Sequence, residues 1–510
     1  MATRRDELSA HTFARKRMLA AFLQPESRVS DEEAPRPVRA MMPSAVMGIV
    51  LVAGFVAWGA IAPSAPPGWD KPGEHIIVDS DSTTRYVVLQ KNKNSKKQLH
   101  PVMNFASAKL VLDKGKGEVI EVSGKDIDES PIARGATIGI PYAPDRLPSK
   151  ADAEAPKEWA VCEKPGGRGE PQQGVFVLGG RDKDKLKNKY RLGDGEALYV
   201  KDSKTGDQYL VDGTGTKMLL HGRNRNDARF QRERLLLTRL VLRKPEEPQT
   251  VSSQWLETLN DGDNLTYPDL EAEAGTPASF AGAEQLPAEA REVGMVLKSS
   301  AAGASYYYVV LKDRVQRTSA LVANLAMGGA DLGQKKPISV SEIQAANAGA
   351  TTKEDSGGRG WPDDVLNPVN RVAQGIDGTS RTVSCSVYTG RTAGGGTPKL
   401  AAWAGPEYPA NIVDGAASAY VSSGSGLLYQ ELSGRGGGGA RFLLTDSGLR
   451  YALPTGGGGN QGGAGASEDS PTARLGYEKS KIAPVPQSWS SLLPKGPTLD
   501  SDSASQEQGL

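Results

Sequence analysis

The chain has 510 residues, a net charge of +1 and 38% hydrophobic residues. A near-neutral chain lacks the basic surface that nucleic-acid binding requires, so we expect no nucleic-acid partner. The length predicts two to four domains, and the 60 glycines indicate many turns and loops. Two cysteines and four scattered histidines (His11, His75, His100 and His221) are too few for a zinc centre, so we expect no metal site.

The first 39 residues form a polar N-terminal tail. In DELSAHTFARKRMLAAFLQP, from Asp6, the acidic start and the proline at the end frame one amphipathic helix. Its apolar residues lie beside a basic run, which favours a helix that docks on a cytoplasmic partner or on the inner membrane surface. The alternative is a basic segment next to the membrane with no partner. The predicted docking residues are Arg15, Lys16, Arg17 and Phe22.

An uncharged apolar run from Ala40 to Ala62 follows the tail. As a helix it would span about 34 Å, enough to cross the hydrocarbon core of a bilayer. Three arginines precede it closely, and only Lys71 follows closely, which places the N-terminus in the cytoplasm and the body outside. A cleaved signal peptide is the alternative, because residues 60–62 read Ala-Ile-Ala, but its charged region would be unusually long.

Four β-hairpins are predicted along the body. Each combines a run of β-branched and aromatic residues, a polar turn and a second run. Helix-like segments follow the first and third hairpins, and Ser123 and Ser341 are suited to cap the short helices that come next. The hairpins begin near Ile76, Leu198, Met295 and Leu427.

A matched tryptophan motif occurs twice. VSSQWLETLNDGDNL, from Val251, and VPQSWSSLLPKGPTL, from Val485, place Trp, Leu and Gly at the same spacing. Because residues four apart share one helix face, the motif predicts a helical turn that packs its tryptophan into a core. Stacking of the tryptophan on a ligand is the alternative.

Two longer stretches, 128–196 and 347–424, lie between the hairpin units, and each holds one cysteine. Outside the cytoplasm a pair of cysteines is most simply a disulfide, so we expect Cys162 to bond to Cys385; two free thiols are the alternative. The two stretches would then form one central domain with the hairpin units around it.

No catalytic centre emerges from the sequence. The chain lacks the G-x-x-x-x-G-K-[ST] loop of nucleotide hydrolases, the G-x-S-x-G nucleophile elbow and the H-E-x-x-H zinc motif. We therefore expect no catalytic residues and no cofactor.

Six segments in order along nearly the whole chain resemble the EccB family of the type VII (ESX) secretion system. They are DELSAHTFARKRMLAAFL, LHPVMNFASAKLVL, IGIPYAPDRLP, EWAVCEKP, LLTDSGLRYALP and LGYEKSKIAPVPQSWSSLLPKGPTL. The resemblance implies a structural core subunit that helps to export small helical WXG-type proteins. It implies assembly with EccC, EccD, EccE and a mycosin protease, with homo-oligomer contacts. Some members are labelled ATPases, but no Walker motif is present here.

The sequence thus predicts an α+β, β-rich protein with one N-terminal transmembrane helix and a large extracytoplasmic body of four α/β repeats around a disulfide-linked β domain. The alternative is a membrane-anchored extracytoplasmic hydrolase, acting on nucleotides or on the cell wall. The predicted segments are the tail (1–39), the span (40–62), the first repeat (76–127), the first stretch of the central domain (128–196), the second repeat with a linker (197–293), the third repeat (294–346), the second stretch of the central domain (347–424), the fourth repeat with Gly-rich insertions (425–500) and a disordered tail (501–510).

Overall fold

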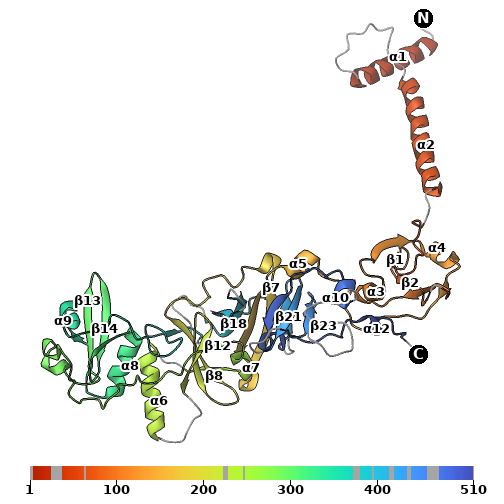
Figure 1. Cartoon of the computed structure of the whole chain (residues 1–510). Helices are drawn as coiled ribbons and strands as arrows, with labels where there is room; N and C mark the ends of the chain where they lie inside the picture. Colours follow the sequence, from red (N-terminus) through yellow and green to blue (C-terminus); the bar gives the residue numbers. More distant parts are fainter. Residues whose placement is uncertain are drawn as a thin grey trace. The chain divides into compact units, whose positions relative to one another are not determined.

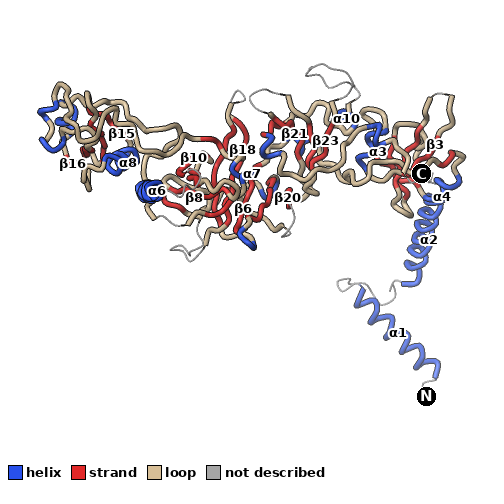
Figure 2. Tube along the Cα trace, turned by 90° about the horizontal axis from the view of Figure 1, so that it is seen from below, coloured by secondary structure: helices blue, strands red, loops and turns tan. Residues whose placement is uncertain are grey.

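The computed structural model describes most of the chain (Figure 1). By internal contacts the chain divides into two units: residues 1–69 with 121–130, and residues 70–120 with 131–510. Figure 2 shows that the second unit is built mainly of strands and loops. The described ranges are 4–23, 37–61, 65–92, 94–221, 228–244, 247–370, 380–392, 396–412, 418–433, 438–455 and 470–508.

The first unit contains two long helices. Helix α1 (Arg4–Leu23) overlaps the predicted tail helix, and α2 (Pro37–Ile61) contains the apolar run except residue 62, which lies outside the described residues. Within the described residues, no helix is both long enough and apolar enough to cross a membrane. The unit also includes α4 (Gly124–Glu129), capped by the side chain of Ser123 as predicted, which accepts a hydrogen bond from Asp126 N.

All four predicted hairpins form, each in a different sheet, and each gains a third antiparallel strand. The tightest turn uses Ala302 and Gly303, both with positive φ, a conformation that matches the twist of the flanking strands. The sets of three strands, one set for each hairpin sheet in chain order, are β1 (His75–Asp79), β2 (Arg85–Leu89) and β3 (Gln98–Pro101); β8 (Glu196–Asp202), β9 (Gln208–Asp212) and β10 (Thr216–His221); β13 (Val296–Ala301), β14 (Ala304–Val310) and β15 (Val315–Thr318); and β21 (Leu427–Leu432), β22 (Arg441–Leu444) and β23 (Arg450–Leu453).

A helix, a further strand and a short second helix follow each set of three strands. In three of the sheets the further strand pairs in parallel with the first hairpin strand. These elements are α3 (Phe105–Val111) and β4 (Glu118–Val122) before α4; α6 (Ala228–Val241), β11 (Gln249–Val251) and α7 (Ser253–Leu256); α8 (Ala320–Ala330), β16 (Ile338–Ser339) and α9 (Glu342–Asn347); and α10 (Pro471–Arg474), β24 (Ala483–Pro486) and α11 (Gln487–Ser490).

Local side chains explain where several of these helices start. Asn104 caps α3 and Ser319 caps α8, each by accepting a backbone N–H three residues on. Ser341 forms a complete capping box with Gln344 at α9, which confirms the predicted cap.

The two stretches that contain the cysteines combine in one five-stranded sheet, ordered β19-β18-β6-β7-β20. The sequence predicted one central domain from these two stretches, and the sheet takes strands from both. Their first residues lie elsewhere, however: β5 (Ala133–Arg134) pairs with β3, and β17 (Asn367–Pro368) pairs with β8. The central strands are β6 (Glu158–Pro165), β7 (Pro171–Leu178), β18 (Val383–Arg391), β19 (Pro398–Gly405) and β20 (Ser418–Val421).

The expectation of disorder from residue 501 onward is wrong for residues 501–508. Asp500 caps the helix α12 (Ser501–Ala504), and Ala504 is fully buried. The chain then forms a bridge from Glu507 to Ile138. The remaining short elements are β12 (Asn260–Asp261), α5 (Lys150–Glu154), and the 3₁₀ turns η1 (Gly167–Gly169), η2 (Gly180–Asp182), η3 (Ala283–Gln285) and η4 (Ala288–Ala290).

Candidate functional site

The predicted docking residues Arg15, Lys16, Arg17 and Phe22 all lie on α1 and are exposed. Phe22 is 90% exposed, more than any other large hydrophobic residue in the described chain. At 100° per residue, Leu8 and Leu19 share the helix face of Phe22, and both are exposed. The prediction missed these two leucines, although the helical period was sufficient to find them.

Cys162 and Cys385 form a disulfide, as predicted. The two residues face each other across the antiparallel strands β6 and β18, and both are fully buried. Because side chains alternate along a strand, the disulfide lies on one face of the central sheet. That face also carries Phe176 and Trp403.

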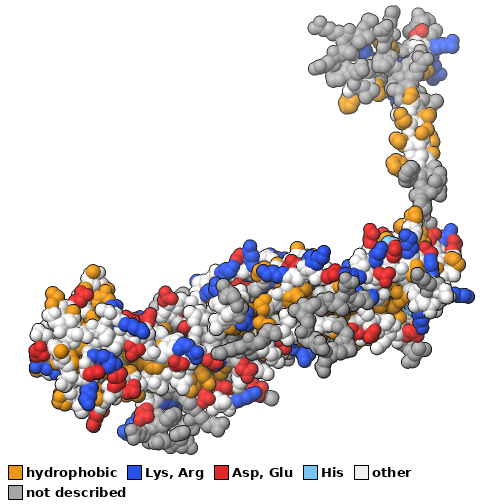
Figure 3. Space-filling model, in the orientation of Figure 1, with side chains coloured by type: hydrophobic (Ala, Val, Ile, Leu, Met, Phe, Trp, Pro, Cys, Tyr) orange, Lys and Arg blue, Asp and Glu red, His pale blue; other side chains and the backbone are white. Residues whose placement is uncertain are grey.

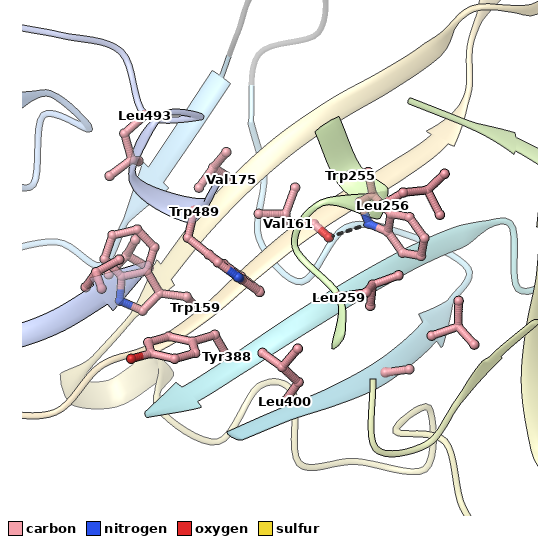
Figure 4. Packing of buried hydrophobic residues seen from close by; sticks show 14 of the residues in the cluster. Trp159, Val161, Val175, Trp255, Leu256, Leu259, Tyr388, Leu400, Trp489 and Leu493 are labelled. Carbon is pink, nitrogen blue, oxygen red and sulfur yellow. Dashed lines mark hydrogen bonds between the residues drawn. The ribbon is translucent and has the colours of Figure 1, made fainter. Parts of the chain in front are cut away.

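The opposite face of the central sheet carries the largest hydrophobic cluster among the described residues. It carries Trp159 and Val161 of β6, and residues of the second and fourth hairpin sheets pack on it. Both motif tryptophans lie in this core, as predicted: Trp255 is 0% and Trp489 1% exposed (Figure 4). Burial of this kind leaves neither ring available to stack on a ligand.

Hydrogen bonds fix both indoles against neighbouring backbone. Trp255 Nε1 donates to the carbonyl of Val161 in β6 at 2.9 Å (Figure 4). Trp489 Nε1 donates to the carbonyl of Thr258, which follows α7, at 3.2 Å. Tyr388 of β18 packs against Trp489, with ring centroids 5.6 Å apart, and donates its hydroxyl hydrogen to Pro484 O at 2.7 Å. The central sheet therefore holds the two tryptophan motifs together.

A buried carboxylate, Glu163, also lies at this junction and was not predicted from the sequence. Glu163 follows the disulfide cysteine in β6, is fully buried and accepts hydrogen bonds from Ser252 N (2.8 Å), Ser252 Oγ and Gln173 Nε2 (3.0 Å). Burial raises the pKa of Glu163, and the three donors oppose that shift. Ser252 is also the cap of α7, so Glu163 connects β6 to the tryptophan helix.

A second polar cluster lies under the fourth hairpin sheet. Arg450 is 4% exposed and pairs with Glu431 at 2.8 Å and with Ser490 of α11. Tyr429 also shares a hydrogen bond with Ser490, and burial raises its pKa to about 12. The members of this cluster bond to one another, which is the pattern of a structural network rather than of a reactive centre.

Potential metal ligands are dispersed over the described ranges. In those ranges, no group of three or more His, Cys, Asp or Glu side chains could hold a metal ion. His100 is buried and places Nδ1 2.9 Å from Ala136 O, which is a structural contact. The structure assembles a buried junction between sheets, and the described residues of the N-terminal helix are exposed.

Comparison with known proteins identifies the family. Residues 1–510 match the model of the family described as "Type VII secretion system ESX-1, transport TM domain B", the EccB family. The chain belongs to this family. It is 27% identical over 521 residues to the "ESX-3 secretion system ATPase EccB3" of Mycobacterium tuberculosis (97% of this chain, 88% of that protein). It is 26% identical over 525 residues to the "ESX-5 secretion system ATPase EccB5" of Mycobacterium marinum (97% and 91%).

Solved structures share the fold. A chain of the "intact ESX-5 inner membrane complex" aligns with a TM-score of 0.59 at 22% identity, covering all of this chain and 96% of that one. A chain of the "EccB3 dimer from the ESX-3 core complex" aligns with a TM-score of 0.60 at 23% identity, covering 84% of this chain and 99% of that one.

Proposed function

We propose that this chain is a structural core component of an ESX secretion membrane complex, where it scaffolds the export of small helical WXG-type proteins. The observation that carries the proposal is the family match over the whole chain, residues 1–510. The buried junction of the body supports it, because the tryptophans and the disulfide are used for packing.

We further infer that the body repeats one unit four times around the central sheet. Four sheets share the order of strand elements: β4-β1-β2-β3, β11-β8-β9-β10, β16-β13-β14-β15 and β24-β21-β22-β23. In each, the third strand gains a parallel neighbour, through β5, β12, Asp355 or Lys495. Identical connectivity in four places is best explained by duplication of one β-β-β-α-β-α unit. Two of the four units keep the tryptophan motif, and both dock on the central sheet.

The N-terminal apolar run is proposed to be a single membrane anchor with the tail in the cytoplasm and the body outside. Support comes from its length, from the arginines that precede it and from the family description, which names a transmembrane domain. A disulfide within the body fits an oxidising compartment.

The proposed partners are EccC, EccD, EccE, a mycosin protease and a second copy of this chain. The solved relatives belong to an inner membrane complex, a periplasmic assembly and a dimer, which supports assembly of this kind here. We assign contact with the cytoplasmic side of the complex to α1, because its basic and aromatic side chains are exposed.

Charge reversal on α1 tests this assignment. We expect the triple variant Arg15→Glu, Lys16→Glu, Arg17→Glu to be made and anchored but to lose co-purification with the other subunits, and to stop export. Single reversals are expected to have little effect, because one surface charge contributes about 1 kcal/mol or less. The matched control is Arg4→Glu with Arg5→Glu at the start of the same helix. Normal export by the triple variant would place the contact elsewhere.

A second candidate function is ATP hydrolysis, because the curated relatives carry the word ATPase in their names. The chain lacks a P-loop, so hydrolysis would need a site of another kind. We favour the scaffold, and a phosphate-release assay on the purified protein separates the two.

A further inference from the structure

One loop departs from the balanced charge of the chain. Residues 180–191, here called the basic loop, contain six Lys and Arg and two Asp, a net charge of +4, whereas the whole chain carries +1. Figure 3 shows acidic and basic side chains intermingled over most of the visible face of the body. The basic loop is therefore a local concentration of positive charge rather than a piece of a uniform surface.

Buried side chains fix the backbone of the basic loop. Leu186 is fully buried in the cluster that contains the disulfide. The carboxylate of Asp182 accepts a hydrogen bond from Tyr420 at 2.8 Å, and Asn188 accepts one from the indole of Trp403 at 3.0 Å and donates to Lys185 O at 2.7 Å. The loop is thus held on the central sheet at three points.

Most of the charged side chains of the basic loop lie on its solvent-exposed side, away from the central sheet. Arg181, Lys183, Lys185, Lys187 and Lys189 are all exposed. Asp182 and Asp184 pair with Lys185 (3.2 Å) and Lys187 (2.9 Å), and Glu158 pairs with Arg191 (3.5 Å). Six positive charges against these three carboxylates leave an excess of three positive charges over residues 181–191. Like charges held this close repel one another, and a bound anion would relieve that repulsion.

We propose that the basic loop binds an anionic polymer outside the membrane. Lysine rather than arginine predominates, and the lysine ammonium acts as a mobile point charge that suits a run of phosphates or carboxylates better than one planar group. The location outside the membrane rests on the proposed topology, whereas polymer binding itself is independent of the secretion role. A scaffold could assemble without this contact, and loss of polymer binding would leave the family assignment intact.

The test uses full-length protein in phosphatidylcholine nanodiscs and fluorescent linear polyphosphate as the probe. We expect binding that weakens steeply with added salt. The variant Lys183→Gln, Lys185→Gln, Lys187→Gln, Lys189→Gln is expected to bind at least about tenfold more weakly at low salt, because it removes four phosphate contacts. All four side chains are exposed, so the protein should remain folded and keep its disulfide, even though the ion pairs of Lys185 and Lys187 are lost.

A matched control removes four exposed lysines from elsewhere in the body: Lys91, Lys96, Lys335 and Lys336, each replaced by Gln. Binding within about twofold of wild type in this control, with the loss confined to the loop variant, supports the proposal. Equal losses in both variants, or no binding by wild type, would overturn it. Flotation with phosphatidylglycerol vesicles without polyphosphate binding would also overturn it, because the ligand would then be a membrane surface.

Discussion

At the scale of single residues, the two motif tryptophans combine apolar burial with a directed hydrogen bond. Each indole fills the core on the central sheet, and each Nε1 has a carbonyl acceptor there. A buried indole without an acceptor would cost free energy, so the acceptor positions at Val161 and Thr258 specify how each helix docks.

We predict that Trp255→Ala and Trp489→Ala each lower the free energy of unfolding of the body by about 3–5 kcal/mol, the usual cost of truncating a buried large aromatic side chain. Chemical denaturation of the full-length protein measures the loss. Tyr142→Ala is the control, since Tyr142 is 87% exposed and its truncation should change stability by about 0.5 kcal/mol or less. An equal effect of all three substitutions would argue against the docking role.

The raised pKa of Glu163 predicts that the free energy of unfolding depends on pH. Because burial raises its pKa in the folded protein, the unfolded chain ionises at a lower pH than the folded one. The contribution of this group to stability is therefore present at acidic pH and is lost as the pH rises from the unfolded value through the folded pKa. Glu163→Gln should remove this component of the pH profile.

The same substitution should also destabilise the protein by about 1–3 kcal/mol, because its amide places a donor against the N–H of Ser252 or the amide of Gln173. Thermal melts between pH 4 and 8 measure both effects, with Glu170→Gln as a control at an exposed position. Parallel wild-type and Glu163→Gln profiles would contradict the assignment.

At the scale of elements, the disulfide joins two strands whose cysteines are 223 residues apart in sequence. We predict one cross-linked peptide pair containing Cys162 and Cys385 in a non-reduced digest, identified by mass spectrometry. Replacing both cysteines by alanine should cost about 2–5 kcal/mol, since the closed loop no longer restricts the unfolded chain. Two thiols that alkylate in the native protein would contradict the bond.

The last residues of the chain act as a strap within the second unit. Leu499 N donates to Ala452 O of β23, Ala504 packs with α3, and Gln508 donates to Thr137 O (2.8 Å) and Gly139 O (3.0 Å). The strap thus connects the fourth hairpin sheet to the segment that follows the first.

A chain that ends at Leu499 should expose this segment. We expect cleavage within residues 131–148 by a protease to be several-fold faster, because the truncation removes the Glu507 bridge and both Gln508 hydrogen bonds. A chain that ends at Gln508 keeps these contacts and is the control. Unchanged cleavage of the shorter chain would show that the strap contributes little.

At the scale of the whole molecule, buried polar groups lie at the junctions between sheets. Among the described residues, polar clusters such as those at Glu163 and Arg450 are buried and hydrogen-bonded at the junctions between sheets, and no group of metal-binding side chains is assembled. Charge accumulates on two exposed segments, α1 and the basic loop, for which we propose contacts with other molecules.

We predict that the purified full-length protein does not hydrolyse ATP above the rate of the detergent buffer, with or without Mg²⁺. Phosphate release measures this, in fractions across a size-exclusion peak so that a contaminating enzyme is separated from the protein. Mg²⁺-dependent turnover that follows the protein peak would favour the ATPase reading over the scaffold.

Local patterns were enough to find the hairpins, the caps at Ser123 and Ser341, the tryptophan motif and the cysteine pair. The hairpins, caps and tryptophan motif depend on residues close in the chain, because strand alternation and helix capping act within a few residues. The cysteine pair could be predicted because the chain contains only two cysteines. The docking role of Arg15, Lys16, Arg17 and Phe22 stays a prediction, and the helical period adds Leu8 and Leu19 to the same exposed helix.

Contacts between segments far apart in the sequence could not be predicted from local patterns. Ser252 reaches Glu163 across 89 residues, and Glu507 returns to Ile138 to order a tail whose polar composition predicted disorder. Such pairings depend on which apolar faces and unpaired backbone groups remain uncovered once the sheets have formed. Only the tertiary structure determines these pairings, because the sequence around a polar residue does not indicate which distant group will be its hydrogen-bond partner.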